Sequence, residues 1–401
     1  MKAIMSLSLI ILFVLSSQFA FGQTAAPFLT ICPSPENNAL GSAGVSLPLN
    51  NAFSIYHNPA FSSFGANERN FSFDYNLTDK EISIPIDNTQ KIAAVAGIDL
   101  SKFYKDLPIS VGIGYLRQSV DLGEFIRTDL SGKIIGKFHG EEWANTLNLS
   151  TSIDCWVKIG IGMNIKFVNS DLGPGAQGNT NAFDFGFFMN APILKESKLI
   201  DGYPVDFNFG LGYSLSNFGD ELTIRSMSDP LPRTSTLGYS LSGSIKHQIN
   251  KSDFKILELQ WTAEASDILA SRLPPISTTK YKSAFENINI WDNILLLKND
   301  NISAVRYGIK VGIFETLSFA FGRNNQDTSI NVAFDSYGIS FQTDGLVKYL
   351  SDATDIELLK FIRKYLILKY SYSKITNSRE SNNYSKTFSY HGLGLAVKLF
   401  D

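Results

Sequence analysis

Strict alternation of apolar residues with small or polar residues is the feature that most constrains the fold of this chain. It is clearest over residues 157–167, which read VKIGIGMNIKF. Eleven residues of this kind match the ~9–11 that a tilted strand needs to cross a bilayer. The same pattern recurs at 205–216, 257–264 and 305–313. Such segments predict strands with one face towards lipid and the other towards a lumen.

A soluble β-sandwich would also show alternation, so the content of the two faces has to decide. The chain has 30 Phe, 16 Tyr and 30 Gly, and only 18% of its residues are charged. Along the long alternating segments, the large aromatic residues fall on one face, whereas glycine and charge fall on the other. Lipid outside the sheet and a filled lumen inside it explain both faces, so we favour a barrel.

The number of alternating segments predicts the size of this barrel. Counting them gives an all-β fold, a transmembrane antiparallel β-barrel of about 14 strands spanning 70–401. The predicted strands are 70–77, 91–100, 109–118, 143–153, 155–167, 181–190, 205–216, 233–246, 254–265, 302–313, 315–323, 330–342, 364–374 and 386–400. The longest connections, 119–142 and 266–301, are then expected outside the cell. The tight connections near Asp154 and Phe314 are expected on the periplasmic side.

One periplasmic connection, 345–363, has a helical pattern and is predicted as a helical insertion. Thr354 and Glu357 fit a capping box, and Ile356, Leu359 and Ile362 follow at helical spacing. Two roles remain open for this helix. It either packs under the barrel or offers a docking surface.

The N-terminus carries the pattern of a secretion signal over residues 1–22. Lys2 precedes an apolar run, and Ala20-Phe21-Gly22 provides small residues for cleavage before Gln23. A transmembrane helix is the competing interpretation, but the run from 4 to 15 is shorter than the ~20 residues that a helical span needs. We therefore expect an exported protein, located in the outer membrane of a Gram-negative bacterium.

Residues 23–69 lack sustained alternation and are predicted to be a plug segment inside the barrel. Asn58 is suited to cap a helix, Pro59 to occupy its first position, and Gly65 to end it. Ala60 and Phe61 then contribute to an apolar face. The predicted plug element comprises Asn51, Asn58, Pro59, Ala60 and Phe61.

The charged residues of the inward strand faces are balanced in sign. If the aromatic face points outward, the lumen receives five acids and five bases: Asp74, Asp184, Asp206, Glu258, Glu264, Lys158, Lys166, Arg306, Lys310 and Lys369. A selective ion pore tends to carry an excess of one sign. We therefore predict a lumen charge network that fills the barrel. A wide wet pore with solvated charges is the alternative.

No catalytic or metal site is predicted, and no cofactor. The four histidines, His57, His139, His247 and His391, lack the spacing of metal ligands. A net charge of −3 gives no basic signature for nucleic acid. The only cysteines, Cys32 and Cys155, are both expected on the periplasmic side, so a disulfide between them is possible; two unrelated thiols are the alternative.

Three segments together carry a resemblance to a known family. They are GSAGVSLPLNNAFSIYHNPAF at 41–61, AFDFG at 182–186 followed by FGLGYSLSNFG at 209–219, and LPRTSTLGY at 231–239. In these segments the chain resembles the FadL-related PorV/PorQ group of Bacteroidetes outer-membrane proteins. The resemblance implies a plugged fourteen-stranded barrel. The long 266–301 loop and the 345–363 helix depart from the group.

The resemblance also frames the expected function. The PorV/PorQ branch implies a non-enzymatic component or accessory of type IX protein secretion and surface attachment, with translocon or secreted cargo as protein partners. The alternative is a FadL-like outer-membrane transporter of hydrophobic small molecules. The transporter hypothesis expects an apolar pocket between plug and wall and a lateral gap, and a continuous wall around a polar, filled lumen would contradict it. A purely structural barrel is a third option.

Overall fold

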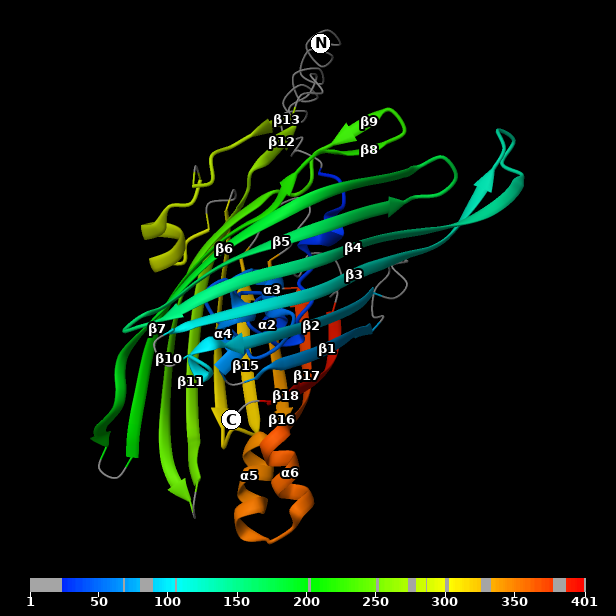
Figure 1. The fold of residues 1–401 in the computed structure, drawn as a ribbon. Helices are drawn as coiled ribbons and strands as arrows, with labels where there is room; N and C mark the ends of the chain where they lie inside the picture. Colours follow the sequence, from blue (N-terminus) through cyan, green and yellow to red (C-terminus); the bar gives the residue numbers. More distant parts are fainter. Residues whose placement is uncertain are drawn as a thin grey trace, which may run out of the picture.

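The computed structural model shows one closed antiparallel barrel of fourteen strands, in the order β1-β18-β17-β16-β15-β14-β11-β10-β7-β6-β5-β4-β3-β2 (Figure 1). The structure describes residues 24–67, 69–79, 89–104, 107–200, 203–249, 252–272, 279–285, 287–299, 303–325, 333–377 and 387–399. The predicted signal segment 1–22 lies outside these residues. Each of the fourteen predicted strands corresponds to one strand of the barrel, so the predicted fold is confirmed.

The first seven barrel strands are β1 (Phe71–Asp79), β2 (Thr89–Asp99), β3 (Ile109–Thr128), β4 (Ile134–Asp154), β5 (Lys158–Asp171), β6 (Gln177–Ile200) and β7 (Tyr203–Gly219). The other seven are β10 (Thr234–Ile249), β11 (Ser252–Ile268), β14 (Ser303–Ile313), β15 (Leu317–Asn324), β16 (Phe334–Gln342), β17 (Leu366–Asn377) and β18 (Thr387–Val397). The wall is therefore uneven in height. The strands from β3 to β11 have 14 to 24 residues, whereas those from β14 to β18 have 8 to 12.

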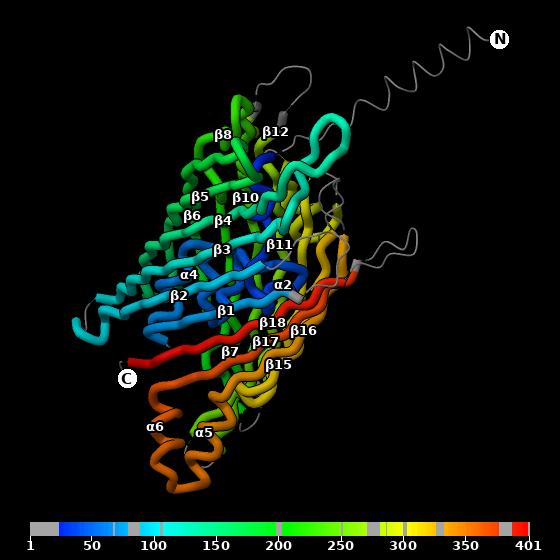
Figure 2. Tube along the Cα trace, turned by 90° about the vertical axis from the view of Figure 1, so that its right-hand side faces the viewer, coloured from blue at the N-terminus to red at the C-terminus, as the bar shows by residue number. Residues whose placement is uncertain are grey.

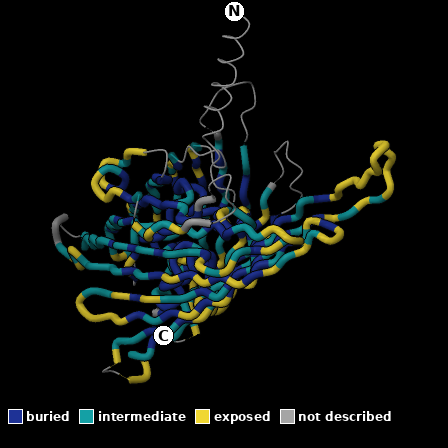
Figure 3. Tube along the Cα trace, turned by 90° about the horizontal axis from the view of Figure 1, so that it is seen from above, coloured by how far each residue is buried: buried dark blue, intermediate teal, exposed yellow. Residues whose placement is uncertain are grey.

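The alternation of the sequence places its apolar residues on the outside of the barrel. Ile113, Leu149 and Phe321 have 55–58% of their surface exposed, while inward residues such as Ala93 and Leu116 are fully buried. Figure 3 shows this division from above, with buried residues in the centre and exposed ones around them. A closed barrel leaves no unpaired strand edge in lipid, and its apolar outer face suits the hydrocarbon region. The protein is accordingly an outer-membrane barrel of a Gram-negative bacterium.

The two rims differ in their connections. Tight turns join β4 to β5 and β14 to β15 at one rim, which we call the inner rim because such barrels turn tightly on the periplasmic side. The predicted loop 119–142 at the other rim, the outer rim, is wrong. Most of it extends β3 and β4 into a projecting hairpin that turns at 129–133 (Figure 1). The sequence pattern did not predict this extension because strands beyond the membrane need not alternate apolar and polar residues.

The outer rim carries two further small elements. The hairpin β8 (Leu222–Ile224) and β9 (Met227–Asp229) follows β7. The long predicted loop 266–301 contains β12 (Ala270–Arg272), β13 (Thr279–Tyr281) and the one-turn π-helix η5 (Ile290–Leu295). Ile288 and Ile294 of this connection pack against Ala265 of β11 and against Leu237 and Tyr239 of β10.

The N-terminal segment lies inside the barrel as short helical turns (Figure 2). These are η2 (Pro27–Thr30), α2 (Pro35–Ala39), α3 (Ser54–His57), α4 (Phe61–Phe64) and η3 (Gly65–Asn67). We call residues 24–67 the plug. It enters the lumen near the outer rim, crosses the lumen, and leaves at the inner rim to begin β1, while the short helix η4 (Leu100–Lys102) follows β2.

The predicted helical insertion at 345–363 is two helices rather than one. They are α5 (Asp344–Ala353) and α6 (Glu357–Tyr365), at the inner rim between β16 and β17 (Figure 1). The predicted capping box is wrong, because Thr354 ends α5 and donates its hydroxyl to the Leu350 carbonyl at 2.8 Å. Within the described residues, no helix has both the length and the apolar character needed to cross a membrane.

Candidate functional site

The outer end of the plug packs on apolar side chains of the part of the wall with the longer strands, β3 to β6. Phe28 and Leu29 are 3% and 2% exposed. They form one cluster with Ala26, with the wall residues Val120, Ala144, Val168 and Ala182, and with Leu222 and Leu231 of the outer-rim connection between β7 and β10. We call this cluster the outer apolar seat. Such contacts are not directional, and their strength follows the apolar area that they remove from water.

The middle of the plug lies against a belt of wall glycines. A Cβ atom added to Gly162 of β5 would lie within 3 Å of the Pro59 carbonyl and the Ala60 nitrogen. A Cβ at Gly212 of β7 would be equally close to the Val45 carbonyl. Plug backbone makes comparable approaches at Gly41 with Gly322, at Leu40 with Gly308, and at Ser62 with Gly112. Glycine in these strands thus makes room for the plug, as the sequence indicated.

Two wall carboxylates hold plug amides directly. Glu264 of β11 accepts hydrogen bonds from the Gly44 and Val45 backbone nitrogens, both at 2.8 Å, and pairs with Arg306 at 2.9 Å. Asp74 of β1 accepts from the Ala52 nitrogen at 2.6 Å. Hydrogen bonds to an ionised acceptor are stronger than neutral ones, and a buried carboxylate needs them. These contacts fix the middle of the plug to opposite parts of the wall.

Glu36 of α2 is the carboxylate that the plug itself contributes. It is 5% exposed, pairs with Lys369, and lies 3.6 Å from the Lys310 nitrogen. Asn51 donates to it at 2.9 Å. Burial alone would raise the pKa of Glu36, but the charges of Lys369 and Lys310 hold that pKa well below its ordinary value. Glu36 therefore stays ionised and ties α2 to β14 and β17.

Glu36 was not among the residues predicted from the sequence, although the sequence contains a signal for it. Between residues 24 and 67 it is the only Asp, Glu, Lys or Arg. A lone acid in a segment predicted to lie among inward lysines is itself evidence for a buried pair. Asn148 was missed as well, and it donates to the Pro59 carbonyl at 2.9 Å.

The remaining predicted charges do not form one continuous network. Lys166 and Asp184 make a separate buried pair at 2.9 Å, shared with Asn164 and Asn217. Lys158 donates to the Phe64 carbonyl at 3.0 Å. Asp206 pairs with Lys246 at 2.7 Å, towards the inner rim, and Glu258 lies 4.0 Å from Lys255. The ten predicted residues thus divide into plug contacts and local pairs.

The predicted plug element lies at the contact between plug and wall. Asn58 donates to the Val45 and Phe187 carbonyls at 2.9 and 2.8 Å, and its side-chain oxygen accepts from the Ala60 nitrogen at 3.1 Å. The helix begins at Phe61 rather than at the predicted Pro59, and Gly65 ends it. Phe61 packs edge-on against Phe188 of β6 with 5.0 Å between ring centroids.

The predicted Cys32–Cys155 disulfide is wrong, because both cysteines are free. The plug enters from the outer rim, so Cys32 is buried in the lumen, whereas Cys155 is exposed at an inner turn. The Cys32 sulfur lies 3.3 Å from Nε2 of His57. Burial raises the pKa of the Cys32 thiol to about 12 and lowers the pKa of His57 to about 3, helped by the Arg306 charge. Both groups are therefore neutral.

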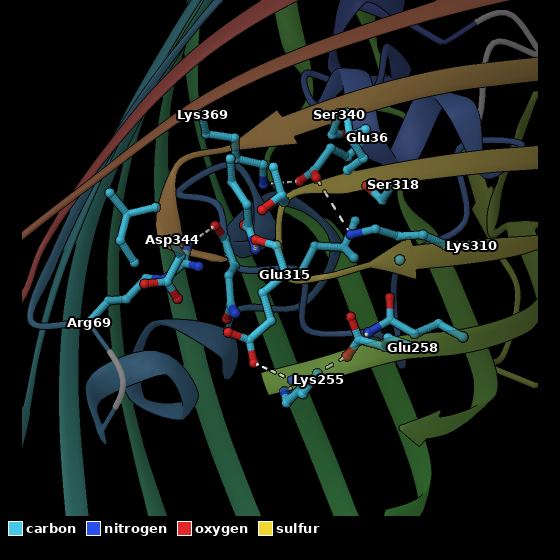
Figure 4. A pocket seen from close by; sticks show the side chains of 18 of the residues that line it. Glu36, Arg69, Lys255, Glu258, Lys310, Glu315, Ser318, Ser340, Asp344 and Lys369 are labelled. Carbon is cyan, nitrogen blue, oxygen red and sulfur yellow. Dashed lines mark hydrogen bonds and ion pairs between the residues drawn. The ribbon is translucent and has the colours of Figure 1, made fainter. Parts of the chain in front are cut away.

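A polar cavity of about 550 Å³ lies on the inner-rim side of the plug, between the plug and the shorter strands β14 to β17 (Figure 4). Glu36, Leu49 and Asn50 of the plug line it on one side. Side chains of β14 to β17 line the other, and Asp344 and Lys348 of α5 extend the lining to the inner rim. Among the described residues, no group of three or more His, Cys, Asp or Glu is placed to hold a metal ion.

The wall itself is continuous through the described strands, and the register shifts in three strand pairs, β3–β4, β6–β7 and β10–β11. The register of β6 against β7 shifts between Phe183 and Phe185. There the Asp184 carboxylate accepts from the Asn217 nitrogen at 2.8 Å, in place of a ladder bond. The transporter hypothesis expected an apolar pocket between plug and wall and a lateral gap, and neither is open among the described residues. The outer apolar seat is an apolar site that plug side chains already fill, and the described wall strands are closed.

Comparison with known proteins gives structural likenesses only. No protein-family model matches the sequence. No curated protein matches it at a significant level. The structure is similar to that of the toluene transporter TodX of Pseudomonas putida, with 10% identity, a TM-score of 0.43, and coverage of 91% of this chain and 97% of that one.

Two further solved structures are similar. The monoaromatic hydrocarbon channel CymD has 9% identity and a TM-score of 0.44, with 92% of this chain and 97% of that chain covered. A Pseudomonas aeruginosa FadL homologue has 11% identity and a TM-score of 0.37, with 94% and 99% covered. At such identities and TM-scores, these likenesses say nothing about what the present chain binds.

Proposed function

We propose that this barrel admits small hydrophobic molecules through the outer membrane, and that the outer end of the plug occupies their binding pocket in the resting state. The outer apolar seat is the observation that carries the proposal. Most of the lumen is lined by polar and charged groups, so a cluster of apolar residues at its outer end indicates a site for an apolar group. Here Phe28 and Leu29 fill that pocket from the chain's own N-terminus.

The proposed route of the hydrophobic molecule follows from the two kinds of contact between plug and wall, which are apolar at the outer end and hydrogen-bonded or charged in the middle. A hydrophobic molecule competes with Phe28 and Leu29 for the seat, because both bind by area rather than by geometry. The middle of the plug is held by buried charges and blocks passage straight down the lumen. We propose the β6–β7 contact beside Ala182 of the seat as the exit, because the register there shifts between Phe183 and Phe185.

Uptake of radiolabelled naphthalene by cells that express the barrel tests this proposal. We expect uptake above that of cells with an empty vector, and an increase of about threefold for the Phe28→Ala/Leu29→Ala variant, because a fractionally freed pocket binds ligand more strongly. The matched control is Ile113→Ala/Leu149→Ala, which removes the same kind of surface from the outer face. Wild-type uptake equal to that of the vector control would contradict the proposal.

A second candidate function is favoured by the inner-rim hairpin of α5 and α6. Leu358 and Phe361 of α6 are 64% and 58% exposed, and α6 buries none of its residues. An exposed apolar helix face suits a protein partner. This is the role that the PorV/PorQ resemblance implies, as a non-enzymatic accessory of type IX secretion acting through the translocon or its cargo.

Site-specific photocrosslinking separates this second candidate from the first. A photoreactive phenylalanine analogue at position 361 is expected to crosslink to a translocon subunit or to a secreted cargo protein in the native membrane. The same analogue at position 319, on the lipid-facing side of β15, is the control. A chain that stays monomeric in mild detergent and forms no such adduct at 361 would exclude the secretion role.

A further inference from the structure

The cavity under the plug has an unbalanced charge. Seven basic and four acidic side chains line it, which leaves an excess of three positive charges in a space of about 550 Å³. Elsewhere in the lumen, Lys166 forms a close pair with Asp184, whereas Lys91 and Lys158 donate to backbone carbonyls of the plug. A local excess of one sign with low-dielectric walls raises the concentration of the opposite charge.

Part of the excess has a visible origin. Lys310 and Lys369 approach the cavity from β14 and β17, and both pair with the single carboxylate of Glu36 (Figure 4). One negative charge is thus shared between two ammonium groups. Glu36 accepts hydrogen bonds from Lys369 and Asn51, while Lys310 lies 3.6 Å away as an ion-pair partner. The lysines therefore keep hydrogen-bonding capacity, because each ammonium has three donors.

Hydroxyl groups lie between the two lysine-bearing strands. Ser318 of β15 and Ser340 of β16 are directly opposite each other in the strand register, and both line the cavity (Figure 4). The lining continues to the inner rim at Lys348 and Lys398. A solute from the periplasmic side therefore meets two ion pairs first, Lys348 with Glu315 and Lys398 with Asp344. Further in, it meets hydroxyl donors beside Lys310 and Lys369.

We propose that this cavity binds a small polyvalent anion carrying phosphate groups. An excess of three charges is matched by a diphosphate-like group rather than by a single carboxylate. Lysine ammonium groups bind phosphate as point charges, and hydroxyl groups add directional donors. The volume falls within the ~300–1,000 Å³ of small-molecule pockets. The inference is independent of hydrophobic uptake, because the outer apolar seat and this cavity share no residue.

Calorimetric titration of the purified full-length barrel with inorganic pyrophosphate tests the inference. We expect saturable binding that weakens as sodium chloride rises from 50 to 500 mM, since salt screens the attraction. Lys310→Gln should weaken binding by about tenfold. Glu258→Gln, which removes an acid from the lining, should strengthen it by about threefold.

The opposite signs of these two variants keep the test informative, because a damaged fold cannot strengthen binding. Lys133→Gln at the tip of the projecting hairpin makes the same charge change away from the cavity and should bind as the wild type does. Equal affinities for all four proteins, or no saturable binding, would overturn the inference.

The same phosphate chemistry could come from a lipid headgroup or from a soluble molecule, and nanodiscs separate these sources. If phosphatidylglycerol nanodiscs abolish pyrophosphate binding that phosphatidylcholine nanodiscs allow, the headgroup is the occupant. If binding is the same in both lipids, the anion is a soluble one. Naphthalene uptake would not change in Glu258→Gln under either result, because Glu258 pairs with Lys255 and not with the plug, so failure of this inference is distinguishable from failure of the transport proposal.

Discussion

The outer end and the middle of the plug are held by different kinds of contact. The outer end, with Phe28 and Leu29, lies on an apolar seat. The middle is held by Glu264, Asp74 and the paired charge of Glu36, and its backbone touches wall glycines. Apolar contacts can be exchanged for a ligand of similar surface, whereas buried charge pairs cannot be broken without leaving a charge unpaired. These contacts therefore predict that the middle of the plug is fixed and that a ligand can displace its outer end.

Removal of the Glu264 carboxylate should lower the free energy of unfolding more than any other substitution considered below. Glu264→Ala leaves two plug amides and Arg306 without their acceptor, so we expect the free energy of unfolding to fall by about 3–5 kcal/mol. Urea titration in detergent, followed by tryptophan fluorescence, measures it. Glu124→Ala, whose exposed partner is Lys137 on the projecting hairpin, is the control and should change stability by less than about 0.5 kcal/mol. A small effect at Glu264 would mean that the middle of the plug is not fixed by charge.

Filling the glycine belt should have a smaller effect. Gly162→Ala places a methyl group against the Pro59 carbonyl, and overpacking of this kind costs about 1–3 kcal/mol. The matched control is Gly243→Ala in β10, where the nearest atom to the added Cβ, on Phe207, is 3.7 Å away. The same urea titration compares the two variants. Equal free energies of unfolding for the two variants would show that the plug backbone moves away from the added methyl group at little cost.

A pH dependence at His57 gives the smallest effect. Its pKa is held at about 3 by burial, so the unfolded chain takes up a proton below about pH 6.5 that the folded chain does not. Stability should therefore fall as the pH falls, by about 1 kcal/mol between pH 6.5 and 5.5 for this group. The slope should disappear in His57→Asn and persist in His139→Asn on the projecting hairpin. An identical slope in wild type and His57→Asn would place the imidazole in contact with water.

Local alternation was sufficient to predict the wall but not the path of the plug. The segment 157–167 identifies β5 because side chains of a membrane strand must alternate between lipid and lumen. The same requirement ends at the membrane boundary, so the outer halves of β3 and β4 were missed. The helical pattern of 345–363 was recognised, but its break at Thr354 was not, because a capping box and a helix end share that residue type.

The site depended on contacts between residues far apart in sequence. Asn58 and Pro59 could be identified locally, because helix-start chemistry involves neighbouring residues. The pairing of Glu36 with Lys369 joins residues more than 300 positions apart, and no local pattern encodes it. The disulfide prediction failed for the same reason. It assumed that the plug stays near the inner rim, whereas Cys32 lies in the lumen beside His57.

The closure of the barrel between β1 and β18 has a consequence for biogenesis. The plug emerges first from the export machinery, yet some of its partners are among the last residues to be made. Pro35 lies against Gly392 of β18, and Glu36 pairs with Lys369 of β17. We therefore expect Glu36 to gain its lysine partners only when the C-terminal strands pair, and the plug to become fixed as the sheet closes between β1 and β18.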